Sequence, residues 1–168
     1  MLSSSLHAPK VFSSSFFKSF SNFISTLPMA TTLIMVKNMI EKYKEFAEFI
    51  LLNLKNKESK IIEVGIGKER AVYDELKRAK ARIIAVDIDI ASEEFVKDDI
   101  TKPNVGIYKG SEIIYSIRPP PELYPFLKEI AKKVKALLII KPLTIDEPPE
   151  FKLVNYKGIA LYIIDFRC

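Results

Sequence analysis

The sequence has no tryptophan and no glutamine, and it contains only one cysteine, one histidine and five glycines in 168 residues. Cys168 is the last residue and His7 lies near the start, so a single chain can form neither a disulfide nor a Cys/His zinc cluster. Nucleophile systems that pair serine or cysteine with histidine are excluded on the same ground. We therefore expect a reducing, cytoplasmic setting and no metal site.

The chain is long enough for one α/β domain with a substantial core, because 48% of its residues are hydrophobic. Isoleucine, lysine and glutamate are abundant while glutamine is absent, a mixture that resembles proteins from hot-growing organisms. This composition bears on habitat and leaves function open.

The first 40 residues contain no acidic residue but three lysines. They account for part of the formal charge of +5, and residues 41–168 carry only +2 (5 − 3). A charge of this size does not by itself indicate a nucleic-acid partner, although RNA or DNA stays open.

Residues 1–34 differ in composition from the rest, with nine serines and five phenylalanines by residue 25 and neither an acid nor a glycine. A transit peptide would contain arginine, and the apolar run 26–36 is too short to span a bilayer. We expect residues 1–34 to be a disordered or spurious leader, residues 35–168 to form the single functional domain, and no membrane attachment.

Apolar residues recur at helical spacing from Asn38 to Leu54, and the segments that follow alternate between strands and helices. The alternation predicts a mostly parallel sheet covered on both faces, an α/β fold. The predicted strands are 60–64, 82–87, 95–98, 112–117 and 136–141, the predicted helices are 69–80 and 121–135, and 151–156 with 159–166 forms a terminal antiparallel hairpin.

Polar or kinked residues lie at the carboxyl ends of four of the predicted strands. They are Glu63 with Gly65, Asp87 with Asp89, Asp98 with Asp99, and Arg118 with its prolines. In an open parallel sheet, ligands bind beyond the carboxyl ends of the strands. The sequence therefore predicts a ligand site at this edge.

The stretch KIIEVGIGKER, residues 60–70, contains the two closest glycines of the chain. A glycine turn before a helix usually binds phosphate, but the dinucleotide pattern GxGxxG is broken at Arg70. Glu63, Glu69, Asp87 and Asp99 surround the turn in the predicted fold, and their charge would oppose a pyrophosphate. A cationic ligand without phosphate, such as S-adenosylmethionine, suits this turn better.

These residues resemble the motifs of class I S-adenosylmethionine-dependent methyltransferases. IIEVGIG looks like the first motif, in which Glu63, Gly65 and Gly67 match the acid and the first two glycines. AVDID looks like the second and VKDDI like the third. The resemblance implies that Asp87 binds the ribose hydroxyls, that Asp99 faces the adenine amino group, and that the cofactor is S-adenosylmethionine.

The resemblance runs from about Met39 to Phe166 and extends to a group of small archaeal proteins with the same IRPP stretch. It implies a minimal Rossmann-like fold with a mostly parallel sheet and a C-terminal antiparallel hairpin. The third glycine of the first motif is missing, since Arg70 occupies its place.

IIYSIRPPPEL occupies the place of the fourth motif, which lies beside the substrate in that family. Arg118, Pro119 and Tyr115 are therefore candidate substrate-binding residues. Proline disfavours the α region for the residue before it, so we expect an extended backbone at Arg118. A guanidinium would repel an amine and hold a carboxylate or phosphate, which indicates an anionic acceptor.

The sequence thus predicts an S-adenosylmethionine-binding protein, with methyl transfer to an acceptor that it does not identify and with no catalytic residue assigned. Methyl transfer depends mainly on positioning and needs no histidine base. Two alternatives stay open: a non-catalytic module that binds a nucleotide or metabolite, and an RNA-associated structural module. The oligomeric state is open as well.

Overall fold

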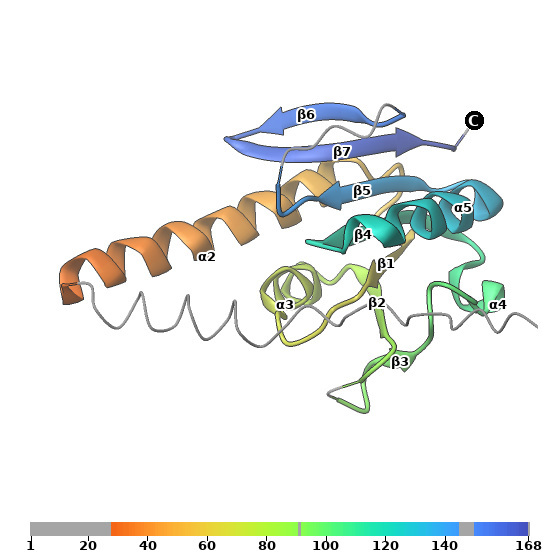
Figure 1. Cartoon of the computed structure of the whole chain (residues 1–168), viewed down its shortest axis with the longest axis horizontal. Helices are drawn as coiled ribbons and strands as arrows, with labels where there is room; N and C mark the ends of the chain where they lie inside the picture. The colour runs from red at the N-terminus through yellow and green to blue at the C-terminus, as the bar shows by residue number, and fades with distance from the viewer. Residues whose placement is uncertain (1–27, 91, 145–149, 168) are drawn as a thin grey trace, which may run out of the picture. The chain divides into compact units, whose positions relative to one another are not determined.

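The computed structural model describes residues 28–90, 92–144 and 150–167, and Figure 1 shows the arrangement of its helices and strands. In chain order the elements are α2 (Met29–Leu52), β1 (Lys60–Val64), α3 (Ala71–Arg78), β2 (Arg82–Asp87), β3 (Val96–Lys97), α4 (Val105–Tyr108), β4 (Ser111–Ile117), the 3-10 helix η1 (Pro121–Leu123), α5 (Tyr124–Val134), β5 (Leu137–Lys141), β6 (Lys152–Tyr156) and β7 (Ile159–Asp165).

Seven strands form one sheet in the order β3-β2-β1-β4-β5-β7-β6. The pairs from β3 to β5 are parallel, whereas β7 is antiparallel to both of its neighbours. The predicted Rossmann-like fold, with a mostly parallel sheet and a C-terminal antiparallel hairpin, is confirmed. The strand order reverses between β1 and β4, and ligands of such sheets bind at the carboxyl ends of these strands.

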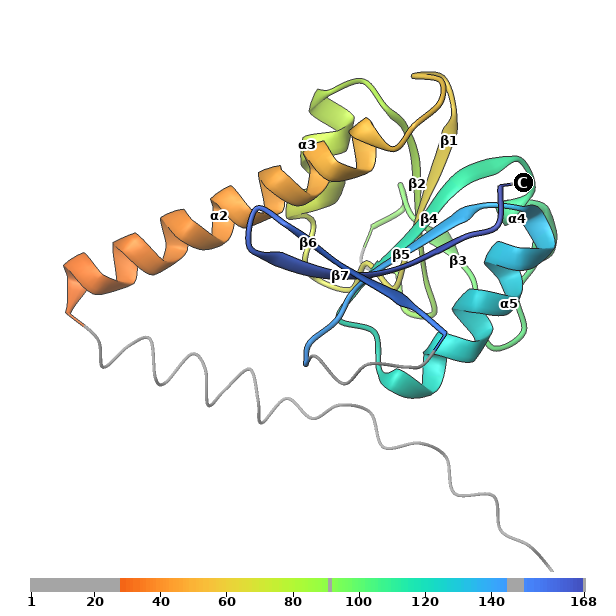
Figure 2. The ribbon, with the colours of Figure 1, turned by 90° about the horizontal axis from the view of Figure 1, so that it is seen from above.

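Helices cover both faces of the sheet, as Figure 2 shows: α3 and the later part of α2 lie on one face, and α4 and α5 on the other. Strand β1 supplies residues to both hydrophobic cores, because successive side chains of a strand point to opposite faces. Ile61 packs in the core on the α2 and α3 side, and Ile62 and Val64 pack in the other.

The chain divides into two compact units, Met1–Met39 and Ile40–Cys168, and the second contains the sheet. Among the described residues, the two hydrophobic cores contain only Tyr43 and residues that follow it in the chain. Helix α2 begins at Met29, earlier than the predicted Asn38. Residues 1–27 lie outside the described part, so the leader and the domain boundary at residue 35 stay predictions.

Two short helices were not predicted. Asn104 starts α4 because its side chain accepts a hydrogen bond from the Gly106 backbone at 3.1 Å. Pro121 begins η1, so the predicted helix 121–135 is divided into this turn and α5. Within the described ranges, no helix is both long and apolar enough to span a membrane.

Candidate functional site

The glycine turn connects β1 to α3 at the point where the strand order reverses. Gly65 has φ of +75° and Gly67 of +53°, which is the left-handed region that side chains rarely adopt. A β-carbon added at Gly65 would lie 3.9 Å from Ser116 Oγ, and one added at Gly67 would meet no atom within 4 Å. Backbone conformation rather than lack of space therefore explains both glycines, and the surface at Gly67 is open.

Asp87, the last residue of β2, holds this turn in place. Its Oδ2 accepts a hydrogen bond from the Gly67 backbone N–H at 2.8 Å, and its Oδ1 accepts one from the Asp89 N–H at 3.0 Å. The turn is also attached to β2 by the Gly65 N–H, which donates to the Val86 carbonyl at 2.8 Å. The structure thus brings together Gly65, Gly67 and Asp87, which the sequence analysis placed in one cofactor site.

Arg70 occupies the place of the third glycine, and its side chain packs on two aromatic rings. Its guanidinium lies 5.1 Å from the ring centre of Phe95 and 5.7 Å from that of Tyr73, and it forms an ion pair with Glu94 at 2.5 Å. Helix α3 begins at the next residue. The turn therefore leads directly into a helix even though the third glycine is missing.

Glu63 lies in β1 two residues before Gly65, and it is buried beside its register partner Tyr115 on β4. It is 1% exposed, and its Oε2 accepts a hydrogen bond from the Tyr115 hydroxyl at 2.6 Å. Burial raises the pKa of the Glu63 carboxyl to about 8, and the Tyr115 hydrogen bond lowers it by less. Glu63 is therefore mainly neutral at pH 7, and neither side chain is exposed to a ligand.

Asp98 and Asp99 follow β3 and organise the loop that leads to α4. Asp99 Oδ1 accepts hydrogen bonds from the Thr101 N–H at 2.9 Å and the Thr101 hydroxyl at 2.7 Å, which lower the pKa of its carboxyl. Asp98 accepts from the Tyr108 hydroxyl at 2.7 Å and the Asn104 N–H at 3.0 Å. Asp99 is half-buried and ionised at the edge where β2 also ends.

Arg118 follows β4 and has φ of +52°, so the prediction of an extended backbone here was wrong. Its N–H donates to the Lys141 carbonyl at 2.7 Å, which continues the pairing of β4 with β5 and holds the residue in the left-handed region. Pro119, which follows, is buried, and Pro120 has the extended conformation (φ −55°, ψ 139°). The exposed Arg118 side chain leaves the sheet next to the glycine turn of β1.

A chain of polar contacts connects Arg118 to α2 and to the glycine turn. Arg118 Nη2 donates to the Tyr43 hydroxyl at 3.2 Å, and that hydroxyl donates to Glu69 Oε2 at 3.1 Å. The sequence analysis assigned Tyr43 only to the apolar face of a helix. Its position between Arg118 and Glu69 depends on how α2 packs on the sheet, and no local pattern signals it.

Lys141 was also missed, although the sequence carried a signal for it. It is the charged residue that ends the apolar strand β5, just as Asp87 ends β2. Burial lowers the pKa of the Lys141 ammonium, and the nearby Arg118 guanidinium lowers it further. The rule that strand ends carry the site would have included this lysine.

Comparisons with known proteins give relatives over most of the chain. The model of a family described as "Uncharacterised protein family (UPF0146)" matches residues 43–166. A UPF0146 protein of Archaeoglobus fulgidus is 44% identical over 124 residues, which cover 71% of this chain and 92% of the relative. A second UPF0146 protein, from Methanocaldococcus jannaschii, is 42% identical over 137 residues. The match covers 76% of this chain and 95% of the relative.

Solved structures with the same fold are methyltransferases. The magnesium protoporphyrin IX methyltransferase of Synechocystis, solved with bound S-adenosylmethionine, superposes with a TM-score of 0.54 at 12% identity over 90% of both chains. A second structure is that of a Methanococcus maripaludis protein assigned provisionally to the S-adenosylmethionine-dependent methyltransferases. It superposes with a TM-score of 0.55 at 11% identity, over 96% of this chain and 97% of that chain. At such low identity the likeness establishes the fold alone, and this chain has a class I methyltransferase-like fold.

Proposed function

We propose that this chain, which belongs to the UPF0146 family, binds S-adenosylmethionine at the glycine turn and serves as a small methyltransferase. The observation that carries the proposal is the 2.8 Å hydrogen bond from the Gly67 N–H to Asp87 Oδ2. It joins a turn with an open surface to a carboxylate, at the edge of the sheet where ligands of this fold class bind.

Asp87 can still accept hydrogen bonds from a ligand. A carboxylate has two oxygens with about four lone-pair sites, and the structure uses one site on each oxygen. The remaining sites suit the two neighbouring hydroxyls of a ribose. Ile88, the next residue, is 61% exposed and offers apolar surface beside Asp87 on which an adenine ring could pack.

The charges around the turn favour a cationic ligand, although fewer carboxylates contribute than the sequence suggested. Glu63 is mainly neutral because it is buried. Glu69 and Asp87 remain at the turn, and Asp99 lies in the loop after β3. S-adenosylmethionine carries a sulfonium and an ammonium, whereas a dinucleotide would bring a pyrophosphate against these acids.

S-adenosylmethionine supplies an electrophilic methyl group: an acceptor lone pair forms the new bond to the methyl carbon, the carbon–sulfur bond breaks, and sulfur keeps that electron pair as the neutral thioether of S-adenosylhomocysteine. The proton of the acceptor passes to water or buffer. Residues of this chain would bind and orient the two partners, which accounts for most of such a rate increase. Arg118 and Pro119 would border the acceptor, with Tyr115 as a buried support beneath them.

The experiment is a calorimetric titration of the protein with S-adenosylmethionine. We expect saturable binding, and a loss of about 1 to 3 kcal/mol in Asp87→Ala because charged-acceptor hydrogen bonds are removed. Glu93→Ala is the matched control, since Glu93 is exposed and no hydrogen bond or ion pair of its side chain occurs among the described residues. Equal affinity in both variants would contradict the assignment of Asp87.

A non-catalytic binding module is the second candidate, because Glu63 and Tyr115 are buried and hydrogen-bonded to each other, so that neither can contact an acceptor. Incubation of the protein with methyl-labelled S-adenosylmethionine and cell extract separates the two. Transfer of label together with formation of S-adenosylhomocysteine supports an enzyme. Unchanged S-adenosylmethionine after long incubation supports the module.

A further inference from the structure

Two cationic residues meet where β4 and β5 end. The register pairs Ile117 with Lys141, and the Arg118 N–H donates to the Lys141 carbonyl at 2.7 Å. Neighbouring strands lie about 4.8 Å apart, so Arg118 and Lys141 leave the sheet side by side. The Arg118 charge lowers the pKa of the Lys141 ammonium, which agrees with this short separation.

The two cations are not balanced by acids among the described residues. No carboxylate in that part of the chain lies within 4.0 Å of the Arg118 guanidinium or of Lys141 Nζ. Glu69 is the acid whose charge acts on Lys141, and its carboxylate is bound to the Tyr43 hydroxyl. The pair, an exposed arginine beside a half-buried lysine, therefore retains an excess of positive charge.

The backbone at Arg118 is strained as well. A φ of +52° is unfavourable for a residue other than glycine, and such positions gather at functional sites. Tyr43 accepts a hydrogen bond from Arg118 Nη2 at 3.2 Å and so limits where the guanidinium can lie. The side chain is thus held beside Lys141 instead of moving freely in solvent.

We propose that Arg118 and Lys141 together bind an oxyanion, a carboxylate or a phosphate, of the molecule that receives the methyl group. This inference rests on the proposed function, and it adds Lys141 to the site. The guanidinium offers a planar pair of donors to two oxygens, and the ammonium adds a compact charge from the neighbouring strand. Tyr43 would act only through Arg118, whose guanidinium it positions.

The strand order places this oxyanion next to the methyl donor. Strand β4 lies between β1, which leads into the glycine turn, and β5, which ends at Lys141. An acceptor held by its anionic group at Arg118 and Lys141 would extend toward the turn across the end of β4. The site therefore selects acceptors with a carboxylate or phosphate near the methylated atom.

Nuclear magnetic resonance titrations with sodium phosphate and, separately, sodium acetate test the site at constant ionic strength. We expect saturable shifts of the backbone N–H signals at positions 118 and 141, which every variant retains, with at least one ion, and the ion that binds more tightly identifies the source of the oxyanion. Lys141→Met and Arg118→Lys should each weaken this binding about tenfold, since each removes charge-assisted hydrogen bonds. Arg118→Lys retains the charge and so tests the planar geometry.

Lys132→Met is the control, because Lys132 is an exposed lysine on α5 at the other face of the sheet. Binding within twofold of the unaltered protein is expected there, and thermal melting confirms that each variant is folded. No saturable shift with either ion, or equal losses in all three variants, would overturn the proposal. Calorimetry of the unaltered protein with S-adenosylmethionine is measured in parallel. If the anion binds and S-adenosylmethionine does not, the proposed function is refuted, whereas Arg118 and Lys141 still form an anion site.

Discussion

Tyr115 donates its hydroxyl to Glu63 Oε2 at 2.6 Å across the pair of strands on which the candidate site is built. Their α-carbons are register partners in β1 and β4, and both side chains are almost completely buried. A buried carboxyl with one hydroxyl partner favours its neutral form, which is why the pKa of Glu63 is raised to about 8. The acid before the glycine turn therefore makes the stability of the fold depend on pH.

The first prediction concerns the pH dependence of stability. The pKa of Glu63 rises from its ordinary value of 4.5 to about 8, so between these values the folded protein holds a proton that the unfolded chain has released. Stability must then fall as pH rises through this window. In urea unfolding, the free energy of unfolding of the unaltered protein should fall by an amount on the order of 3 kcal/mol between pH 5 and pH 8. Glu63→Gln keeps a carbonyl acceptor for Tyr115 and should not show this fall.

Glu93→Gln is the control, because it removes an exposed carboxylate and should keep the pH dependence of the unaltered protein. If Glu63→Gln and the unaltered protein lose stability in parallel between pH 5 and pH 8, Glu63 does not titrate in this window.

The second prediction separates backbone strain from ligand contact. Gly67 and Gly110 both have positive φ, of +53° and +76°, and a β-carbon would meet no atom within 4 Å at either position. Gly67→Ala and Gly110→Ala should each lower the free energy of unfolding by about 1 kcal/mol. Only Gly67→Ala should also weaken S-adenosylmethionine binding in calorimetry. Equal affinity of the two variants for S-adenosylmethionine would show that the glycine turn is not part of the cofactor site.

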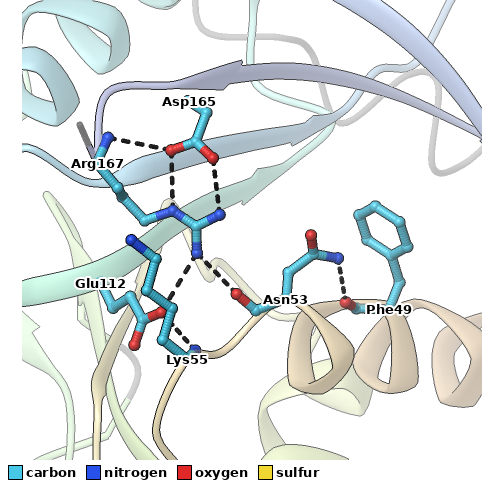
Figure 3. A network of polar contacts seen from close by, with 6 residues as sticks. All are labelled: Phe49, Asn53, Lys55, Glu112, Asp165 and Arg167. Atoms are coloured by element: carbon cyan, nitrogen blue, oxygen red, sulfur yellow. Dashed lines mark hydrogen bonds and ion pairs between the residues drawn. The ribbon is translucent and has the colours of Figure 1, made fainter.

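The third prediction concerns the polar network in Figure 3, which lies at the end of the sheet opposite to the candidate site. The Arg167 guanidinium donates to both oxygens of Asp165 at 2.7 and 2.8 Å and to the Asn53 carbonyl at 2.7 Å, and lies 3.3 Å from Glu112 Oε1. Its side chain is only 13% exposed. Arg167→Ala should therefore lower the free energy of unfolding by about 1 to 3 kcal/mol, as measured by urea unfolding.

Arg82→Ala provides the comparison, since Arg82 is an exposed arginine at the start of β2. It should change stability by less than about 0.5 kcal/mol. The affinity for S-adenosylmethionine should stay the same in both variants. A weaker affinity in Arg167→Ala would show that the network acts on the site and not only on stability.

The fourth prediction is that a chain beginning at Met35 melts within a few degrees of the full chain. Among the described residues, the hydrophobic cores contain nothing before Tyr43. For a domain of this size, a loss of 1 kcal/mol lowers the melting temperature by roughly 2 to 4 °C. A larger drop in thermal melting would mean that residues 1–34 contribute to the fold.

The bounds of β1 and β2 could be predicted to the residue, because Gly65 follows the last residue of β1 and the charged Asp87 ends the apolar run of β2. The mostly parallel sheet and its C-terminal antiparallel hairpin followed from the alternation of the segments and from the resemblance. The left-handed backbone of Arg118 could not be predicted: the local rule for residues before proline was overruled by a hydrogen bond to Lys141 on the next strand.

The candidate site shows the same division between local and distant causes. The residue type of Gly65 and Gly67 alone predicts their turn, and Asp87 ends its strand as expected. That Glu63 is neutral could not be read from the sequence, since it depends on burial of the carboxyl by segments that are far apart in the chain. Tyr115, beside which Glu63 is buried, is 52 residues away. Sequence position identified the acids, but burial decides which of them carry charge.

Calorimetric titration of the unaltered protein with S-adenosylmethionine and with NAD tests the central claim most directly. The turn, Asp87 and Glu69 suit a cationic ligand without phosphate, so we predict saturable binding of S-adenosylmethionine and little or no binding of NAD. Tighter binding of NAD than of S-adenosylmethionine, or no binding of either by a folded sample, would contradict the account.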